Sequence, residues 1–253
     1  MSSRDIVARV LARLLPASIM RDKRYFALWE ERGYHVTPVH FYELIPDTRQ
    51  FGTDVFTRQT EMPGVDMNRD GQLALLDRFE SLYKQEYDAF PQASTDRPEE
   101  FYLHNTLFES VDAEILYCMV REFRPRRIIE IGSGFSTRLS AMAIRRNREL
   151  SVDCDCELIC VEPNPRPEIR QGFDGLSRLV ESRVQDLPVE FFAELDENDI
   201  LFIDSSHVVA LNSDVCYEYL ELLPRLRKGV IVHVHDILMP RLYVEHWHRQ
   251  RMF

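Results

Sequence analysis

Acidic and imidazole side chains follow two apolar segments in the C-terminal part of the chain. Asp204 comes directly after the run ILFI, and His207 stands three residues later. His235 and Asp236 follow the next apolar run, VIVHV. Carboxylates and imidazoles can move protons near neutral pH, and together they can bind a divalent metal. The spacing therefore predicts a site for acid–base or metal chemistry at these two segment ends.

A second candidate site surrounds a glycine turn. The run RIIEI leads into Gly132-Ser133-Gly134, which holds two of the nine glycines in the chain. Glycine allows a tight turn and a close approach of the backbone to a ligand, and a following helix would offer free backbone N–H groups. The dinucleotide pattern G-x-G-x-x-G fails, because Thr137 stands in its last position.

Two acids flank this turn. Glu130 precedes the first glycine by two positions, and Glu162 ends the next apolar run, LICV. A carboxylate beside the turn would repel a pyrophosphate and suits a ligand that carries hydroxyls or a positive charge. We expect Glu162 to lie close enough to hold both hydroxyls of a ribose.

The elements that must position these residues alternate from residue 126 onward. Short apolar runs predict five strands, at Arg127–Ile131, Leu158–Val161, Arg178–Val180, Ile200–Ile203 and Val230–Val234. Helical candidates lie between them, at 136–146, 165–174, 188–195 and 210–226. Strand–helix alternation predicts an α/β fold with a mostly parallel, doubly wound, Rossmann-like sheet. Ligands of such sheets bind at the carboxyl ends of the strands, so both candidate sites are expected at one edge.

The part of the chain before residue 126 lacks this alternation of strands and helices. Apolar spacing predicts helices over 4–15, 70–90 and 110–123, while 34–68 looks irregular and 91–100 resembles a polar joint. Arginines on the other face of the first helix suit either docking on the protein or binding to a membrane surface, and we favour docking. We predict an N-terminal helical and irregular extension over 1–100 and a catalytic domain over 101–253.

Composition disfavours nucleic-acid-binding, membrane-spanning and disulfide-rich secreted proteins. The chain has 253 residues, is 45% apolar, and carries a net charge of −11, which disfavours binding to nucleic acid through a general basic surface. No apolar run reaches the roughly 20 residues of a membrane-spanning helix. The five cysteines are scattered and no secretory signal opens the chain, so we expect free thiols and a cytoplasmic location. A homo-oligomer is compatible with the sequence.

Four motifs, in their order and spacing, resemble the class I S-adenosylmethionine-dependent methyltransferases, in the branch labelled methyltransferase domain 24. They are E-x-G-S-G-x-S-T, the acid after the second strand, FIDSSH and GVIVHVHD. The resemblance covers about residues 101–253. It implies S-adenosylmethionine as methyl donor and a small molecule as acceptor.

The resemblance also implies roles for particular residues. The amino-acid part of the cofactor would lie in the glycine turn, the ribose at Glu162, the adenine beside Gln185-Asp186, and the reactive methyl near Asp204. The turn would contribute Glu130, Gly132, Ser133, Gly134, Phe135 and Ser136. Ser136 stands where many members of the class carry a third glycine.

Two chemical roles stay open for the polar segment ends. If the acceptor is a hydroxyl, His207 or His235, with Asp236, could act as the catalytic base. Alternatively, Asp204, His235 and Asp236 could hold a divalent metal, which would lower the pKa of the acceptor hydroxyl. We favour the metal-free base.

Three functions remain compatible with these residues. The first is O-methylation of a small polyhydroxylated metabolite or sugar. The second is a non-catalytic module that binds a cofactor or a partner, which the short segment after Asp236 suggests, because sheets of this class normally continue for two more strands. The third is an NAD-dependent oxidoreductase on a Rossmann-like sheet, which Glu130 and the missing third glycine disfavour.

Overall fold

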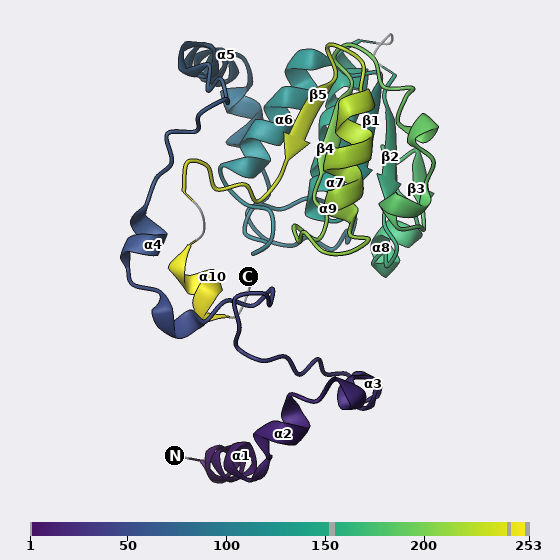
Figure 1. The fold of residues 1–253 in the computed structure, drawn as a ribbon. Helices are drawn as coiled ribbons and strands as arrows, with labels where there is room; N and C mark the ends of the chain where they lie inside the picture. Colours follow the sequence, from purple (N-terminus) through teal and green to yellow (C-terminus); the bar gives the residue numbers. More distant parts are fainter. Residues whose placement is uncertain (1, 152–154, 242–243, 251–253) are drawn as a thin grey trace. The chain divides into compact units, whose positions relative to one another are not determined.

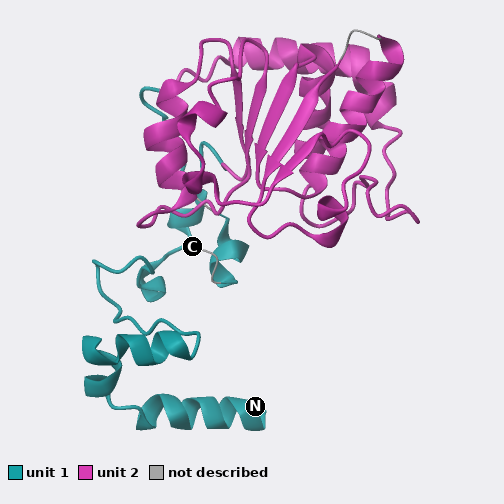
Figure 2. Cartoon of the chain, turned by 90° about the vertical axis from the view of Figure 1, so that its right-hand side faces the viewer, with its two compact units in different colours: residues 1–64, 238–253 teal, residues 65–237 magenta. Residues whose placement is uncertain are grey.

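The computed structural model describes residues 2–151, 155–241 and 244–250. The chain forms two compact units, residues 65–237 and residues 1–64 together with 238–253 (Figure 2).

Residues 65–237 are built around a five-stranded sheet with the order β3-β2-β1-β4-β5 (Figure 1). Every neighbouring pair of strands is parallel. The strands are β1 Arg127–Ile131, β2 Glu157–Val161, β3 Arg178–Val180, β4 Ile200–Ile203 and β5 Ile231–Val234. The predicted α/β, Rossmann-like parallel sheet is confirmed, and each predicted strand agrees to within one residue.

The register aligns the carboxyl ends of four strands. Ile131 pairs with Val161 on one side and with Ile203 on the other, and Ile203 pairs with Val234. One further backbone hydrogen bond extends each pairing beyond the strand ends. The Gly132 N–H donates to β2, and the Asp204 N–H donates to β1. In the same way, the Glu162 N–H donates to β3 and the His235 N–H donates to β4. The sheet therefore brings the glycine turn, Glu162, Asp204 and His235 to a single edge.

Alternating side chains give the sheet two apolar faces. Ile128, Leu158 and Phe202 pack on one face with the helices α6 and α7. Ile129, Val161 and Leu201, among others, pack on the opposite face with Phe192 and Leu222. Figure 1 shows α6 and α7 behind the sheet and α9 in front of it. A parallel sheet covered on both faces explains why its strands are apolar runs without alternation.

The helices of this unit differ in length. They are α5 Arg69–Tyr87, α6 Asp112–Phe123, α7 Phe135–Leu150, α8 Pro167–Arg170 and α9 Asp214–Tyr217. A π-helical turn, Glu218–Leu222, follows α9, and 3₁₀ turns lie at Val184–Asp186, Val189–Phe191 and Leu223–Arg225.

Three predicted helices are shorter or broken. The candidate 188–195 holds only a 3₁₀ turn of three residues, since its β-branched and aromatic side chains favour other conformations. The candidate 165–174 reduces to four helical residues. The candidate 210–226 changes from α-helix to π-helix and then to a 3₁₀ turn at Pro224, which lacks the N–H that an α-helix needs.

The first hundred residues divide differently from our prediction, which placed a boundary after residue 100. The structure groups 65–100 with the sheet, because α5 buries Phe79 and Tyr83 in the core around α6. Glu86 of α5 also forms an ion pair with the buried Arg121 of α6, with Nε 2.8 Å from Oε2.

The other unit contains short helices and no residue that is buried among those described. They are α1 Ser3–Leu14, α2 Ala17–Met20, α3 Phe26–Glu31, α4 Asp54–Thr57 and α10 Glu245–Arg249, with 3₁₀ turns at Lys23–Tyr25 and Thr48–Gln50. The predicted amphipathic helix is present as α1, and its apolar residues Ile6, Val10 and Leu14 stay exposed. None of the helices in the described ranges is long and apolar enough to cross a membrane.

The cysteines in the described residues are free thiols. Cys118, Cys156 and Cys160 are buried, and Cys216 is half-buried. Cys154 lies outside the described residues. Burial raises the pKa of Cys118 and Cys156 to about 12 each, so these thiols stay protonated and fill space.

Candidate functional site

A cavity of about 290 Å³ lies at the carboxyl edge of the sheet, beside the glycine turn. We call it the turn cavity. Four predicted cofactor residues line it: Gly132, Glu162, Gln185 and Asp204. A small-molecule site needs a concave surface with a few convergent polar groups, and the turn cavity meets both conditions.

The two glycines of the turn differ in whether the structure would allow a side chain at their positions. Gly132 has φ +104°, and a Cβ there would collide with the backbone carbonyl oxygen of Asp204. Gly134 is extended, and a Cβ there would meet nothing within 4 Å. Gly132 is therefore required by the close approach of β1 to β4, whereas Gly134 borders open space.

The hydroxyl of Ser133, between these glycines, is buried and has no hydrogen-bond partner among the described residues. An unpaired buried hydroxyl is costly unless a ligand or water completes it. The turn therefore carries an unpaired buried hydroxyl, although neither Ser133 nor Gly134 is among the residues that line the turn cavity.

Glu130 does not reach the turn cavity. It is 1% exposed, and its Oε1 accepts hydrogen bonds from the hydroxyls of Ser136, at 2.6 Å, and Thr137, at 3.0 Å. Burial raises the pKa of Glu130 to about 8, although those two hydrogen bonds act in the opposite direction. The carboxyl thus holds the start of α7 beneath the turn.

Three other predicted cofactor residues also have protein partners. Phe135 is buried, with its ring 5.1 Å from that of Tyr102. Ser136 donates its hydroxyl to Glu130. Asp186 is exposed, and its carboxylate pairs with Arg183 at 2.7 Å. None of these side chains lines the turn cavity.

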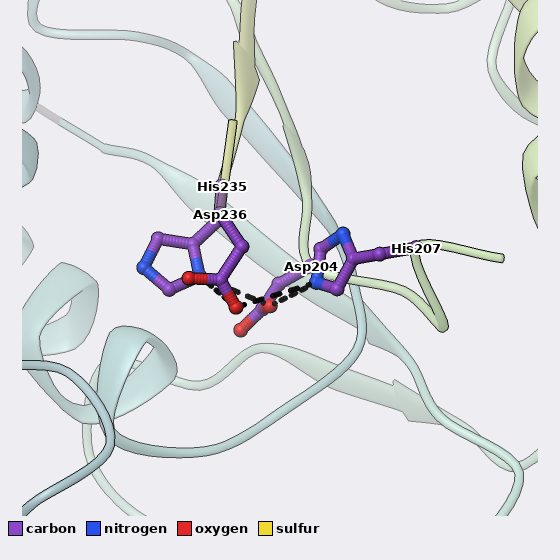
Figure 3. A group of neighbouring side chains, drawn as sticks. All are labelled: Asp204, His207, His235 and Asp236. Atoms are coloured by element: carbon purple, nitrogen blue, oxygen red, sulfur yellow. Dashed lines mark hydrogen bonds and ion pairs between the residues drawn. The ribbon is translucent and has the colours of Figure 1, made fainter. Parts of the chain in front are cut away.

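On the other flank of this cavity, the structure brings together Asp204, His207, His235 and Asp236 (Figure 3). We call these four residues the strand-end cluster. Asp204 Oδ1 lies 3.3 Å from Nε2 of His207 and 3.2 Å from Nδ1 of His235. Asp236 Oδ2 lies 3.7 Å from the same two nitrogens. One ligand atom from each residue falls within 4.8 Å of all the others.

Charges in the cluster are strongly coupled. Burial disfavours a charge on Asp204, but hydrogen bonds from His207 and His235 hold its pKa below the usual range. The hydrogen bond to Asp204 raises the pKa of His207. Burial opposes protonation of His235, but hydrogen bonds to Asp112 and Asp204 raise its pKa to about 10. At neutral pH, His235 is therefore an imidazolium between carboxylates.

Two residues of the cluster have left-handed backbone conformations. The φ angle is +59° at His207 and +55° at Asp236. Residues other than glycine rarely adopt such angles, and those that do concentrate at functional sites. The backbone is strained where both side chains turn toward Asp204.

The sequence interpretation missed the surroundings of His235. Asp112 Oδ2 lies 3.6 Å from His235 Nε2, and the Phe108 ring lies 5.0 Å from the imidazole. No spacing signal in the sequence links Asp112 to a strand more than a hundred residues away. The His233 ring lies 4.5 Å from the Phe202 ring in a tilted arrangement, and burial lowers the pKa of His233 to about 4, so this imidazole stays neutral.

Residues 129–237 match a protein family described as "Methyltransferase domain". An uncharacterised protein of Archaeoglobus fulgidus is 34% identical over 182 residues, which cover 67% of this chain and 78% of that protein. The chain belongs to this methyltransferase family. It is a class I S-adenosylmethionine-dependent methyltransferase, as its motifs predicted.

A solved structure gives a weaker likeness. It is a putative protein-L-isoaspartate O-methyltransferase from Plasmodium falciparum in complex with S-adenosyl-L-homocysteine. The sequence identity is 14% and the TM-score 0.30, and the match covers 50% of this chain and 60% of that one. The fold assignment therefore rests on the sheet order and register described above.

The methyl donor of this enzyme class is S-adenosylmethionine, a cation with a polar amino-acid end and a ribose. The turn cavity has groups that fit such a ligand. It combines three acids, Glu162, Asp204 and Asp214, and one cation, Arg183, with the backbone of Gly132.

Proposed function

We propose that this methyltransferase transfers the methyl group to a hydroxyl of a small molecule. The observation that carries the proposal is the shared position of Asp204, which lines the turn cavity and contacts both histidines of the strand-end cluster. A hydroxyl acceptor must lose a proton during methylation, and an imidazole is well suited to accept it.

For the cofactor, we propose that Ser133 and the backbone around Gly134 hold the amino-acid end, that Glu162 holds the ribose hydroxyls, and that Gln185 lies beside the adenine. The free hydroxyl of Ser133 and the open space at Gly134 support the first assignment. The ionised carboxylate of Asp204 would favour the positively charged sulfonium nearby. Glu130, Phe135, Ser136 and Asp186 would then support the site without touching the ligand.

In the chemical step, the acceptor oxygen attacks the methyl carbon, and the bond between that carbon and the sulfonium sulfur breaks. The products are the methyl ether and S-adenosylhomocysteine, and the hydroxyl proton passes to His207. We assign Nδ1 of His207 as the acceptor of this proton, because Nε2 faces Asp204. His235 is a less suitable base, since it is 7% exposed and already protonated at neutral pH.

This assignment predicts the direction of the pH dependence. The base must be neutral to accept a proton, and the hydrogen bond to Asp204 raises the pKa of His207 above its usual 6.5. The rate should therefore rise with pH, with a midpoint above 6.5, and the D204N variant should move that midpoint down.

The geometry of the cluster also supports a metal-assisted variant of the same reaction. Asp204, His235 and Asp236, with His207, offer two nitrogen and two oxygen donors within 4.8 Å of one another. A mixed set of this kind suits Mn²⁺, Fe²⁺ or Zn²⁺ better than Mg²⁺. A bound ion would lower the pKa of the acceptor hydroxyl.

Calorimetric titration tests the cofactor first. We expect the protein to bind S-adenosylhomocysteine and not NAD. Binding of NAD alone would overturn the assignment of the turn cavity.

The H207N variant tests the base, because asparagine tolerates the left-handed backbone at this position. Transfer of labelled methyl groups to a metabolite extract should fall by about 10²–10⁴-fold, which is the usual contribution of a general base. Binding of S-adenosylhomocysteine should stay unchanged. If methylation persists at the wild-type rate, His207 is not the base.

Chelation separates the two variants of the mechanism. With a metal-free base, EDTA leaves activity unchanged, and Mn²⁺ does not stimulate the enzyme. Activity that is lost in EDTA and restored by Mn²⁺ would establish the metal-assisted form.

A polyhydroxylated acceptor or sugar, a cytoplasmic location and a homo-oligomer stay predictions from the sequence. The absence of nucleic acid among the substrates also stays a prediction, which rests on the net charge of −11.

A further inference from the structure

A second cavity, of about 460 Å³, opens beside the strand-end cluster, and we call it the apolar cavity. Its lining residues come from the ends of β4 and β5, the loop after β4, and the segment of α9 with its π-helical turn. Most of the residues that line it are apolar. Among these are Ile203, Val209, Val215, Leu220, Val234 and Ile237.

The apolar cavity has three polar side chains that are joined to one another or to the strand-end cluster. Ser205, His207 and Glu218 all line it. The Ser205 hydroxyl donates a hydrogen bond to Glu218 Oε2 at 3.1 Å. His207 is bonded to Asp204 of the strand-end cluster instead (Figure 3).

Glu218 lacks a partner for its second oxygen. Its side chain is fully buried, and Oε1 has no hydrogen-bond partner among the described residues. Burial raises the pKa of Glu218 to about 7, so the carboxyl is in part protonated at neutral pH. An acid in an apolar wall is costly for stability unless a ligand completes its hydrogen bonds.

The apolar cavity adjoins the cavity assigned to the methyl donor. Ser205 lines both cavities, and Asp204, which lines the turn cavity, contacts His207 in the apolar cavity. A molecule in the apolar cavity could therefore place a hydroxyl at His207, whose ring contacts the carboxylate that lines the turn cavity.

We propose that the apolar cavity binds the methyl acceptor, and that the acceptor is an apolar small molecule with the reacting hydroxyl at His207 and a second hydrogen-bond donor at Glu218. This inference rests on the proposed O-methylation. Glu218 is then a specificity-determining residue, because its free oxygen selects acceptors that carry the second donor group.

The composition of the cavity wall disfavours a sugar. A sugar carries a hydroxyl on most of its carbons, and each buried hydroxyl needs a partner. Besides the apolar side chains, the lining offers only Ser205, His207, Glu218 and Tyr219 as clear hydrogen-bonding groups, which are too few for so many hydroxyls. The acceptor class inferred here therefore differs from the polyhydroxylated acceptor that the sequence led us to expect.

Two matched variants of the full-length protein test the location. V215F would fill the apolar cavity from α9, whereas L211F adds the same ring to a fully exposed residue of the neighbouring loop. With labelled donor and a metabolite extract, we expect the labelled product to partition into octanol. V215F should reduce that product by about tenfold or more, and L211F should not, since enclosed pockets discriminate on small volume changes.

A third variant tests Glu218. Tyramine, which has a phenol hydroxyl and an amine, should be a better acceptor than 4-ethylphenol, which lacks the amine. E218Q should reduce this preference by about tenfold, because a buried carboxyl no longer meets the amine. Unfolding in urea, followed by circular dichroism, shows whether V215F and E218Q remain folded, and E218Q alone decides the question if V215F does not fold.

The outcomes separate this inference from the proposed function. Label that appears only in water-soluble sugars, and that V215F leaves unchanged, would overturn the apolar acceptor while O-methylation stands. An unchanged preference for tyramine in E218Q would overturn the role of Glu218. Two other results would overturn the proposed function itself. One is labelled methyl groups found on nitrogen or carbon atoms of the acceptors, and the other is a wild-type protein that does not bind S-adenosylhomocysteine.

Discussion

The glycine turn and the strand-end cluster lie at the same edge of the sheet, yet they are built differently. The turn is held in place by close packing and by buried hydrogen bonds. Gly132 passes close to the end of β4, and the buried Glu130 accepts hydrogen bonds from two hydroxyls at the start of α7. At the cluster, side-chain charge dominates, and two histidines share Asp204 on a strained backbone. The turn is therefore mainly a structural element of the fold, whereas the strained backbone and buried charges of the cluster cost stability and suit the cluster to proton transfer.

The largest expected effect comes from the turn. G132A should destabilise the protein by about 3 kcal/mol or more, because a Cβ at φ +104° meets the backbone of Asp204. G134A should change the free energy of unfolding by less than about 1 kcal/mol but weaken the binding of S-adenosylhomocysteine. Urea unfolding and calorimetric titration measure the two quantities. Equal stability losses in both variants would break the distinction between a structural and a ligand-facing glycine.

Glu130 gives the next largest effect. E130A leaves the hydroxyls of Ser136 and Thr137 without their buried acceptor and should cost about 2–3 kcal/mol. E130Q keeps an acceptor oxygen and should cost much less.

The pH dependence of E130Q supplies the control. Glu130 has a folded-state pKa of about 8 against an ordinary 4.5, so the wild type should lose stability as the pH rises from 4.5 to 8. E130Q lacks this titration, and its unfolding midpoint should fall less over the same range. Parallel curves for the two proteins would mean that Glu130 is ionised in the folded state.

At the cluster, D112N tests the charge on His235. The folded-state pKa of His235 is about 10 against an ordinary 6.5, so its stabilisation is complete below pH 6.5 and is lost as the pH rises toward 10. Because Asp112 is largely exposed, we expect D112N to cost no more than about 1 kcal/mol near pH 6. The gap in unfolding free energy between wild type and D112N should close toward pH 10. A gap that stays constant would show that Asp112 does not act through the imidazolium.

The smallest expected effect isolates the strained backbone. D236A and D236G both remove the carboxylate, but only alanine keeps a Cβ at φ +55°. D236G should therefore be about 0.5–1 kcal/mol more stable than D236A in urea unfolding. Equal stability of the pair would mean that the backbone at this position relaxes without cost.

The sequence predicted the strands better than the helices. Fully buried parallel strands appear as short apolar runs, and from residue 126 onward these runs alternate with longer mixed segments. The segment 188–195 also carries apolar residues, and its Phe192 and Leu195 are buried, but they pack from turns. Burial by itself does not say which local conformation delivers a side chain to the core, so these helices could not be predicted reliably.

The candidate site, too, was predictable from the sequence only in part. The order of the motifs and the rule that parallel strands end at one edge were enough to predict that Asp204, His207, His235 and Asp236 converge. The inward direction of Glu130 was not predictable, because a strand-end acid can face a ligand or the following helix, and the packing of α7 selects the helix. The partnership of Asp112 with His235 depends on where α6 packs, and no local pattern encodes that position.

By itself, the chain of residues determined the parallel sheet, the methyltransferase class and the strand ends that carry the chemistry, because these follow from local patterns of apolar, glycine and acidic residues. Only the tertiary structure decided which acid is buried, which histidine is charged, and that an apolar cavity with the unpaired Glu218 adjoins the cluster. These properties depend on desolvation and on distances between residues remote in the chain, which spacing along a sequence does not contain.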